Sequence, residues 1–220
     1  MRADDPFYQQ LARVGQALSS PARLALLDWL RQGGRTVEAL ANEAGLSLAN
    51  TSQHLKVLRQ ARLVEAERQG TFVRYRVADP AVDGFYAALR DLAEARLAEV
   101  QQIARAFVER RDSLEPVDRR HLLQRTRRGE VVVLDVRPAE EYRAAHIAGS
   151  VSVPLTELRQ RLASLPKGRD IVAYCRGPYC ILAPEAVTLL RRRGFRAEVL
   201  SDGVAEWRAR GLPVAVGEAP

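Results

Sequence analysis

The sequence predicts two domains of different fold class: a mainly helical domain over residues 1–112 and an α/β domain with a parallel sheet over residues 113–220. Up to about residue 112, apolar residues recur mainly at the three- and four-residue spacing of helices. Beyond it, short β-rich segments alternate with helical ones. A chain of 220 residues is long enough for each domain to bury a core of its own.

The composition is that of a folded globular protein, with 47% hydrophobic and 28% charged residues. No apolar run approaches the length of a membrane span, and Asp4 and Asp5 stand where a signal peptide would have its apolar stretch. We therefore expect a cytoplasmic protein with no membrane partner. In a reducing compartment, the pair Cys175 and Cys180 is more typical of a reactive or metal-binding site than of a structural disulfide.

The N-terminal half predicts helices followed by a hairpin. The expected order is a short helix at 36–44, a helix at 47–60, strands at 63–68 and 71–77, and a long helix at about 80–111. Gly45 interrupts the first two helices, Ser47 caps the second, and Gln69-Gly70 forms the hairpin turn. This is the order of a winged helix-turn-helix, whose second helix enters the major groove of DNA and whose hairpin rests on the backbone.

The second helix carries a specific motif. Residues 52–64 read Ser-Gln-His-Leu-Lys-Val-Leu-Arg-Gln-Ala-Arg-Leu-Val and resemble the recognition-helix signature of the ArsR family of bacterial repressors. The resemblance covers roughly residues 7–108. Arg62 departs from it, because the family usually has a glycine in the left-handed turn after this helix. The resemblance implies a homodimer, formed through the first and last helices, that represses by binding double-stranded DNA at an inverted repeat.

Candidate DNA contacts follow from the apolar face of this helix, on which we expect Leu48, Leu55 and Leu58 to point inward. The polar residues left for DNA are Asn50, Ser52, Gln53, His54 and Lys56. Amide side chains pair with adenine edges, whereas hydroxyl, imidazole and ammonium groups bond phosphates. Arg68 and Arg74 flank the hairpin tip and are candidate wing contacts to phosphate or the minor groove.

The charge distribution fits this interpretation without proving it. The formal net charge is +7, and basic residues outnumber acidic ones over residues 53–76. A solvated charged face is the alternative for this cluster, and a core or capping role is the alternative for His54. The N-terminal half has no cysteine and its last helix has no histidine, so we expect the sensor to lie elsewhere and expect no metal site in this half.

The second half alternates strand and helix. The expected strands are 131–134, 150–153, 170–174 and 197–200, and the expected helices 156–165 and 184–193. Cys175 follows a strand and precedes a helix, at the edge of a parallel sheet where active loops lie. Backbone N–H groups and the helix dipole at such a position lower the pKa of a thiol, so the sequence predicts a nucleophilic thiolate at Cys175.

The surrounding motifs resemble the rhodanese family. They are, in chain order, Leu134-Asp135-Val136-Arg137, Glu141-Tyr142, His146-Ile147-Ala148-Gly149-Ser150, the Cys175 loop, Asp202-Gly203-Val204 with Trp207, and Gly211-Leu212-Pro213-Val214. The resemblance implies that the loop cysteine takes a sulfane sulfur from thiosulfate or a persulfide and passes it on, without a cofactor. Asp135, Arg137 and His146 look more like structural supports than chemical participants.

The length of the loop discriminates between chemistries. Phosphatases and arsenate reductases of this fold need an arginine six residues after the cysteine, and that position is Ile181 here. A loop from Cys175 to Cys180 suits a single persulfide sulfur instead, and Arg176 could guide an anionic donor. Two departures from the family stand out: Pro178 removes one N–H group from the loop, and Cys180 stands where the family usually has Ser, Thr or Arg.

The leading interpretation is a DNA-binding repressor whose rhodanese-like domain senses or transfers sulfane sulfur through a Cys175 persulfide. The competing interpretation is a thiosulfate or persulfide sulfurtransferase for which DNA binding is autoregulation. If the loop brings the sulfurs together, Cys180 could attack the persulfide and bridge the loop. Cys175 as an inert buried thiol, Cys180 as a small helix-start residue, and a Cys-x4-Cys metal site lacking two further ligands remain as alternatives.

Overall fold

The computed structural model describes residues 2, 4–109, 114 and 117–218. The chain divides into two compact units, residues 1–83 and 84–220. Helix α5 (Pro80–Arg96) contributes its first turn to the first unit and its remainder to the second. The predicted domain boundary between residues 112 and 113 lies outside the described residues. Among the residues that the structure describes, none of the helices combines the length and apolar character needed to cross a membrane.

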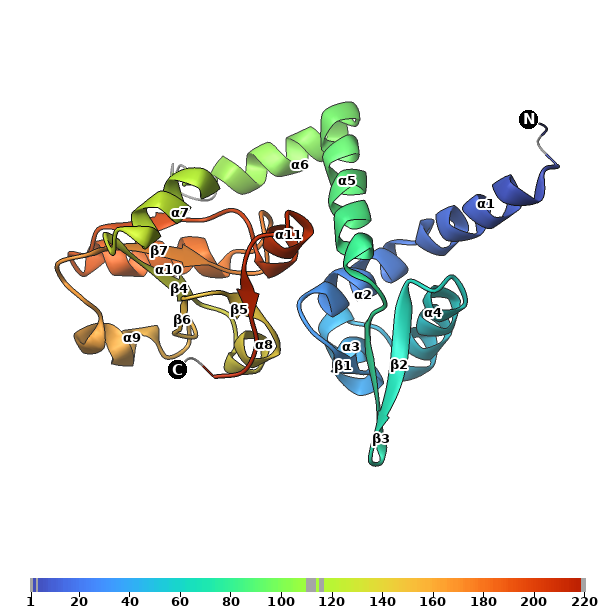
Figure 1. Ribbon diagram of the computed structural model, residues 1–220, viewed down its shortest axis with the longest axis horizontal. Coiled ribbons are helices and arrows are strands. Elements are labelled where there is room, and N and C mark those ends of the chain that lie inside the picture. The colour runs from blue at the N-terminus through green and yellow to red at the C-terminus, as the bar shows by residue number, and fades with distance from the viewer. Residues whose placement is uncertain (1, 3, 110–113, 115–116, 219–220) are drawn as a thin grey trace. The chain divides into compact units, whose positions relative to one another are not determined.

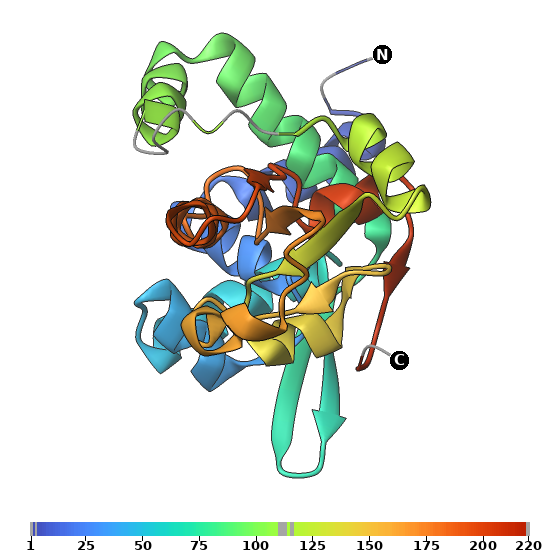
Figure 2. The same cartoon turned by 90° about the vertical axis from the view of Figure 1, so that its left-hand side faces the viewer.

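The first unit is a winged helix-turn-helix, as predicted (Figure 1). Its elements are α1 (Pro6–Leu18), α2 (Pro21–Arg31), β1 (Arg35–Thr36), α3 (Val37–Ala44), α4 (Leu48–Gln60), β2 (Val64–Gln69) and β3 (Phe72–Val77). Helices α2, α3 and α4 pack on one another, and the strands form a sheet of order β1-β3-β2. The antiparallel β2–β3 hairpin projects beyond the helices of its own unit (Figures 1 and 2).

The helix-turn-helix is fixed by its caps. The Ser47 side chain accepts a hydrogen bond from the Asn50 backbone N–H, 3.2 Å away, and so starts α4 as predicted. Arg62 adopts the left-handed φ of +59° that a glycine would take at no steric cost. The Leu63 N–H bonds the Leu58 carbonyl across this turn, at 3.0 Å. The family's usual turn is thus kept, with a non-glycine residue in the strained position.

Two expectations about the helices are wrong. Leu48 is 51% exposed, whereas Leu55 and Leu58 are buried, because Leu48 lies in the first turn of α4 and the inward face begins at Thr51. The single helix expected over 80–111 is two helices, α5 and α6 (Ala98–Glu109), which change direction at Leu97 (Figure 1). Neither Pro nor Gly marks the break, so the sequence carries no local signal for it.

The second unit contains the predicted parallel sheet, of order β6-β4-β7-β8. After α6 its elements are α7 (Arg119–Arg127), β4 (Val131–Asp135), α8 (Ala139–Ala144), β5 (His146–Ile147), β6 (Val151–Ser152), α9 (Leu158–Arg161), a 3-10 turn (Leu162–Ser164), β7 (Asp170–Tyr174), α10 (Leu182–Arg192), β8 (Ala197–Val199), α11 (Val204–Ala209) and β9 (Val214–Ala215). Strands β5 and β9 form a separate antiparallel pair.

Strand β7 explains where the loop cysteine points. Ile171 and Ala173 pack with α9 and α10 on one face of the sheet, and Val172 and Tyr174 pack with α7 and α11 on the other. The two-residue period places Cys175 on the α10 side, within the first of these cores. The thiol therefore leaves the carboxyl end of a central strand and enters the protein interior.

Candidate functional site

Helix α4 separates its residues into a buried and an exposed face. Thr51, Leu55 and Leu58 lie on the buried face, at the spacing of successive helical turns. The exposed face carries the predicted DNA-contacting residues Asn50, Ser52, Gln53 and Lys56. His54 lies at the border and is half-buried. Helix α4 thus presents amide, hydroxyl and ammonium groups outward on a rigid scaffold.

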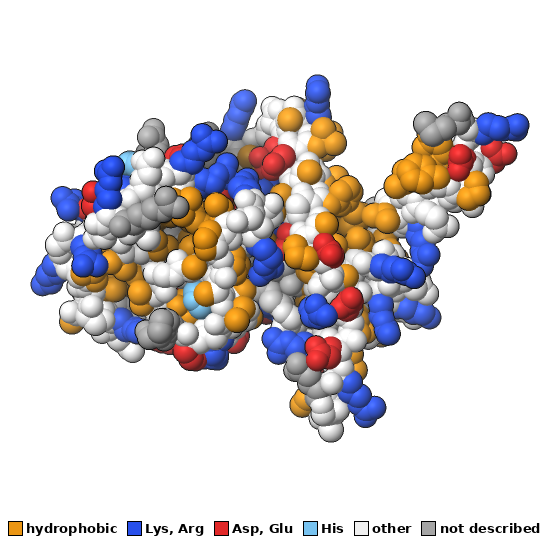
Figure 3. Space-filling view, in the orientation of Figure 1, with side chains coloured by type: hydrophobic (Ala, Val, Ile, Leu, Met, Phe, Trp, Pro, Cys, Tyr) orange, Lys and Arg blue, Asp and Glu red, His pale blue; other side chains and the backbone are white. Residues whose placement is uncertain are grey.

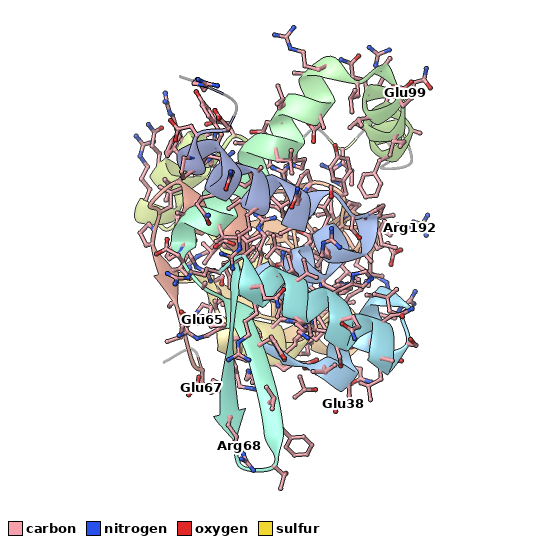
Figure 4. The ribbon with its side chains drawn as sticks, turned by 90° about the vertical axis from the view of Figure 1, so that its right-hand side faces the viewer. Glu38, Glu65, Glu67, Arg68, Glu99 and Arg192 are labelled. Atoms are coloured by element: carbon pink, nitrogen blue, oxygen red, sulfur yellow. The ribbon has the colours of Figure 1, made fainter. Side chains whose placement is uncertain are left out.

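The hairpin adds a second, mixed-charge surface. Arg68 is exposed at its tip, whereas Glu65 and Glu67 lie further along the same strand (Figure 4). Arg76 pairs with Glu65 at 2.6 Å, so it is not a simple addition to the positive charge. The Arg74 side chain is exposed and lies beside Gly34, whose missing Cβ would stand 2.9 Å from Nε. Lys and Arg side chains gather over α4 and the hairpin, with acidic groups between them (Figure 3).

The cysteine loop connects β7 to α10. Cys175 is only 2% exposed, and Cys180 is half-buried. The Cys175 thiol lies 3.5 Å from the Cys180 carbonyl oxygen, and the two thiols hydrogen-bond to each other. The structure therefore brings together the two cysteines whose proximity the sequence left open.

The two thiols have opposite acidities. Burial, followed by the hydrogen bond and charge of Cys180, raises the pKa of Cys175 well above its usual value, although the Gly177 and Ala183 N–H groups act in the other direction. The hydrogen bond from Cys175 lowers the pKa of Cys180 to about 6, helped by the N–H groups of Arg176 and Leu182 and by the Arg176 charge. The predicted low pKa of Cys175 is wrong, because the helix-start donors do not offset its burial. Of the two thiols, Cys180 is the one that ionises more readily.

Arg176, the residue expected to guide an anionic donor, pairs with a carboxylate of its own unit. Its guanidinium forms a bidentate pair with the buried Glu141 carboxylate, with Nη2 at 2.6 Å from Oε1 and Nε at 3.1 Å. A pocket of about 330 Å³ lies beside this pair. Its lining is Val136, Pro138, Ala139, Glu140, Pro154, Leu155, Thr156, Glu157, Arg176 and Leu182. This lining is largely apolar, with two further carboxylates, so it is not a strongly cationic anion site.

Two glycines, Gly177 in the cysteine loop and Gly203 before α11, allow neighbouring atoms to approach the loop closely. A Cβ on Gly203 would lie 2.5 Å from the Arg176 carbonyl and 2.9 Å from the Cys175 oxygen. A Cβ on Gly177, whose φ is +141°, would lie 3.1 Å from the Glu206 carboxylate. Sequence reasoning placed Gly203 within a motif but missed Glu206, because only the folded chain brings that carboxylate to the loop.

A buried polar network supports the edge of the sheet below the loop. Asp135 and Arg137 form a fully buried ion pair at 2.6 Å, and the Tyr174 hydroxyl donates to the same carboxylate at 2.6 Å. The ring of His146 is buried and stacks on Tyr142, with centroids 3.7 Å apart. These contacts fit the expected structural role. The described residues hold no group of three or more His, Cys, Asp and Glu side chains placed to bind a metal ion.

The comparisons with known proteins agree with both units. The helix-turn-helix domain family matches residues 18–67 and the rhodanese-like domain family matches residues 118–210. The HTH-type transcriptional regulator Rv0324 of Mycobacterium tuberculosis is 45% identical over 208 residues, which cover 94% of this chain and 91% of that protein. The chain belongs to this family of ArsR-type regulators with a rhodanese-like domain. The present chain is also similar, over part of its DNA-binding half, to CmtR of Mycobacterium tuberculosis. The identity is 44% over 69 residues, which cover 31% of this chain and 58% of CmtR.

Among solved structures, the present chain is similar to fragment 1–100 of Mb0332 from Mycobacterium bovis, a homodimeric winged helix-turn-helix DNA-binding domain. The identity is 39%, the match covers 45% of this chain and 94% of that one, and the TM-score is 0.41. The family assignment rests on the full-length relative. The protein is therefore a transcriptional regulator that combines a DNA-binding winged helix with a rhodanese-like domain.

Proposed function

We propose that this regulator is a cytoplasmic repressor that reports sulfane sulfur to its DNA-binding half through a persulfide on Cys175. The observation that carries the proposal is the hydrogen-bonded pair Cys175 and Cys180 at the carboxyl end of β7, in a chain that also carries an ArsR-type helix-turn-helix. The described part of the first unit contains no cysteine, so any thiol chemistry has to occur in the second.

We place the DNA contacts on α4 and the hairpin. The exposed amides of Asn50 and Gln53 have the paired donor and acceptor that adenine edges require. Ser52, His54 and Lys56 from α4, and Arg68 and Arg74 from the hairpin, are assigned to phosphates or the minor groove.

We further propose a homodimer on an inverted repeat whose half-sites lie about one helical turn apart. Exposed apolar side chains support it: Phe7 and Leu11 on α1 are 60% and 54% exposed, and hydrophobic side chains are visible on α1 in Figure 3. A monomer in sedimentation at micromolar concentration, or equal affinity for random DNA at physiological salt, would contradict this assignment.

The first chemical step forms the persulfide. The Cys180 thiolate accepts the Cys175 proton along their hydrogen bond while Sγ of Cys175 attacks the outer sulfur of the donor. A new S–S bond forms at Cys175 and the donor's S–S bond breaks. The electron pair leaves with the donor residue, as sulfite from thiosulfate or as a thiolate from a persulfide. Cys180 is then a thiol beside an electrophilic sulfur.

The second step bridges the loop. Cys180 attacks Sγ of Cys175, the outer sulfur leaves as hydrosulfide with the Cys180 proton, and a Cys175–Cys180 disulfide remains. The two cysteines are oxidised and the sulfane sulfur is reduced, so no external oxidant is needed. The bridge removes the Cys180 thiolate charge and constrains a loop that is otherwise held by hydrogen bonds.

The charges around Arg176 favour one donor class over the other. Arg176, which follows Cys175 in the loop, is neutralised by Glu141, and Glu140 and Glu157 add negative charge to the mainly apolar pocket that Arg176 lines. A dianion such as thiosulfate is therefore disfavoured relative to a persulfide or polysulfide with an apolar body.

The deciding experiment combines mass spectrometry with gel shifts on the upstream DNA. The wild type, treated with a polysulfide, gains one sulfur atom or loses two hydrogens, and its operator affinity changes. Cys175→Ser does neither. Cys180→Ser keeps the persulfide and responds less or not at all on DNA. Modification of Cys180 alone, or no modification by any donor, removes the assignment of Cys175 as the nucleophile.

The competing function is a sulfurtransferase with autoregulatory DNA binding. The match to the rhodanese-like domain family over residues 118–210 favours it, whereas the 2% exposure of Cys175 argues against rapid turnover with an external donor. Sustained multiple turnover of thiosulfate or a persulfide with an acceptor thiol, together with an operator affinity that no donor changes, would establish the enzyme.

A further inference from the structure

The second half of α5 packs on the wall of the cysteine loop through charged and hydroxyl groups. Arg90 Nη1 donates to Oε1 of Glu206 at 2.9 Å, and Arg90 Nε lies 3.6 Å from the Glu94 carboxylate. The Tyr179 hydroxyl, from the loop itself, donates to Glu94. Tyr179 also makes an edge-on ring contact with Phe107 of α6, with centroids 5.7 Å apart. All these residues belong to the second unit.

Glu206 joins this helix to the loop. The carboxylate is 2% exposed, and its Oε2 accepts the Gly203 N–H at 3.0 Å. A Cβ added at Gly177 would meet the same carboxylate at 3.1 Å, and one added at Gly203 would meet the Arg176 carbonyl at 2.5 Å. A displacement of the loop at Gly177 therefore meets Glu206, and one at Arg176 meets Gly203, whose N–H donates to Glu206.

The other end of α5 is fixed independently. Asp83, in its first turn, pairs with Arg31 of α2 at 3.2 Å, and both side chains are buried. These two residues belong to the first unit. Asp83 and Arg90 are seven residues apart, which places them on the same face of α5, two turns from each other. One helix thus carries an ion pair of each unit, fully buried in the first and half-buried at Arg90 in the second.

We propose that α5 is the element that reads the sulfur state of the loop, through Glu206 to Arg90 and through Tyr179 to Glu94. Persulfidation or bridging of Cys175 displaces Gly177 and Tyr179, and these two contacts pass the displacement to α5. This inference rests on the proposed sulfur chemistry and names its route to the DNA-binding half. Arg90 and Glu94 are positioning residues, since neither touches a reacting sulfur. Couplings of this kind change affinity by about 5- to 150-fold.

The test is a variant of full-length protein that cuts both contacts without touching the loop. Arg90→Gln with Glu94→Ala removes both α5 partners and leaves the net charge unchanged. The matched control, Arg96→Gln with Glu99→Ala, makes the same chemical changes at exposed positions of α5 and α6. Polysulfide uptake is followed by intact mass, and operator affinity by gel shift with and without donor.

We expect the contact variant to take up sulfur as the wild type does, while its affinity change on treatment falls below about twofold. The control keeps the full change. A contact variant that responds like the wild type overturns the route through α5 and leaves the sulfur chemistry standing. A wild type that takes up no sulfur, or whose affinity ignores it, overturns the proposed function and this inference together. If the double variant binds the operator poorly before treatment, the single variants Arg90→Gln and Glu94→Ala replace it, each cutting one contact; a full response in both overturns the route through α5.

Discussion

Helix α4 and the cysteine loop present their functional side chains in opposite ways. On α4 the groups that we assign to DNA are exposed except for the half-buried His54, and the helix beneath them is held by a cap and a buried face of three residues. In the loop the functional groups are partnered within the chain, whether buried like Cys175 or exposed like Tyr179: Cys175 with Cys180, Arg176 with Glu141, and Tyr179 with Glu94. The exposed face of α4 is available to a separate molecule, whereas the groups of the loop are paired with one another or with other residues of the chain.

This difference determines how substitutions act. Exposed groups on a rigid helix act one by one, so their removal changes binding locally and additively. Buried groups that share hydrogen bonds and charge act as a unit, so each change alters the acidity or position of its neighbours. The following predictions test this contrast.

The largest effect separates two leucines of α4. Leu55→Ala leaves a cavity in the first unit and lowers the free energy of unfolding by about 2–5 kcal/mol. Leu48→Ala, at a position that is 51% exposed, changes it by about 0.5 kcal/mol or less. Urea unfolding of both variants checks this. Equal losses would mean that Leu48 is buried in solution, for instance by a second copy of the chain.

Gln53→Ala comes next. If the exposed Gln53 amide pairs with a base edge, as we propose, its removal weakens operator binding by about 1–3 kcal/mol and relaxes the preference at one or two base pairs. Binding to random DNA stays as in the wild type, because phosphate contacts supply it. Competition binding with a set of single-base operator variants measures both. An equal loss of affinity on all sequences would show that Gln53 contacts the DNA backbone and not a base edge.

The loop should show its coupling in a pH titration. The lowered pKa of about 6 means that Cys180 is a thiolate above that pH and a thiol below it, so its alkylation rate falls as the pH drops through 6. In Cys175→Ala the donated hydrogen bond is gone, the thiolate loses stabilisation, and the midpoint moves to higher pH. Iodoacetamide labelling followed by peptide mass mapping gives both midpoints. An unchanged midpoint in the variant would show that the two thiols ionise independently.

The smallest effect is expected on the hairpin. Arg74→Gln removes the phosphate contact that we assign to this residue, so we expect it to weaken binding to all sequences alike and to reduce the slope of log affinity against log salt by about 0.9. Arg76→Gln is the matched control, since Arg76 is already paired with Glu65 and its loss should change the slope less. Equal slopes for both variants would remove Arg74 from the DNA contacts.

The same contrast explains what the sequence could predict. The helix-turn-helix, the hairpin and the parallel sheet follow from local periodicity and caps, and the exposed face of α4 follows from the spacing of Thr51, Leu55 and Leu58. The acidity of Cys175 cannot be predicted from the local sequence, because burial in a core formed by distant segments raises its pKa more than its local N–H donors lower it. The pairing of Arg90 with Glu206 joins residues 116 positions apart, and no short motif announces it.

The close approach of Gly203 to the loop also limits the space available around Cys175 for an added atom. Cys175 is 2% exposed, its own peptide touches Gly203, and its side chain packs in the core with α10. An added sulfur atom would therefore act on this domain as an overpacking mutation acts on a filled core, at a cost of about 1–3 kcal/mol. A persulfide held in that space is a compressed side chain, and its strain is relieved when the outer sulfur leaves or the surrounding elements shift. The strain from one added sulfur, about 1–3 kcal/mol, is therefore the largest free energy that persulfidation can contribute to a shift of the surrounding elements.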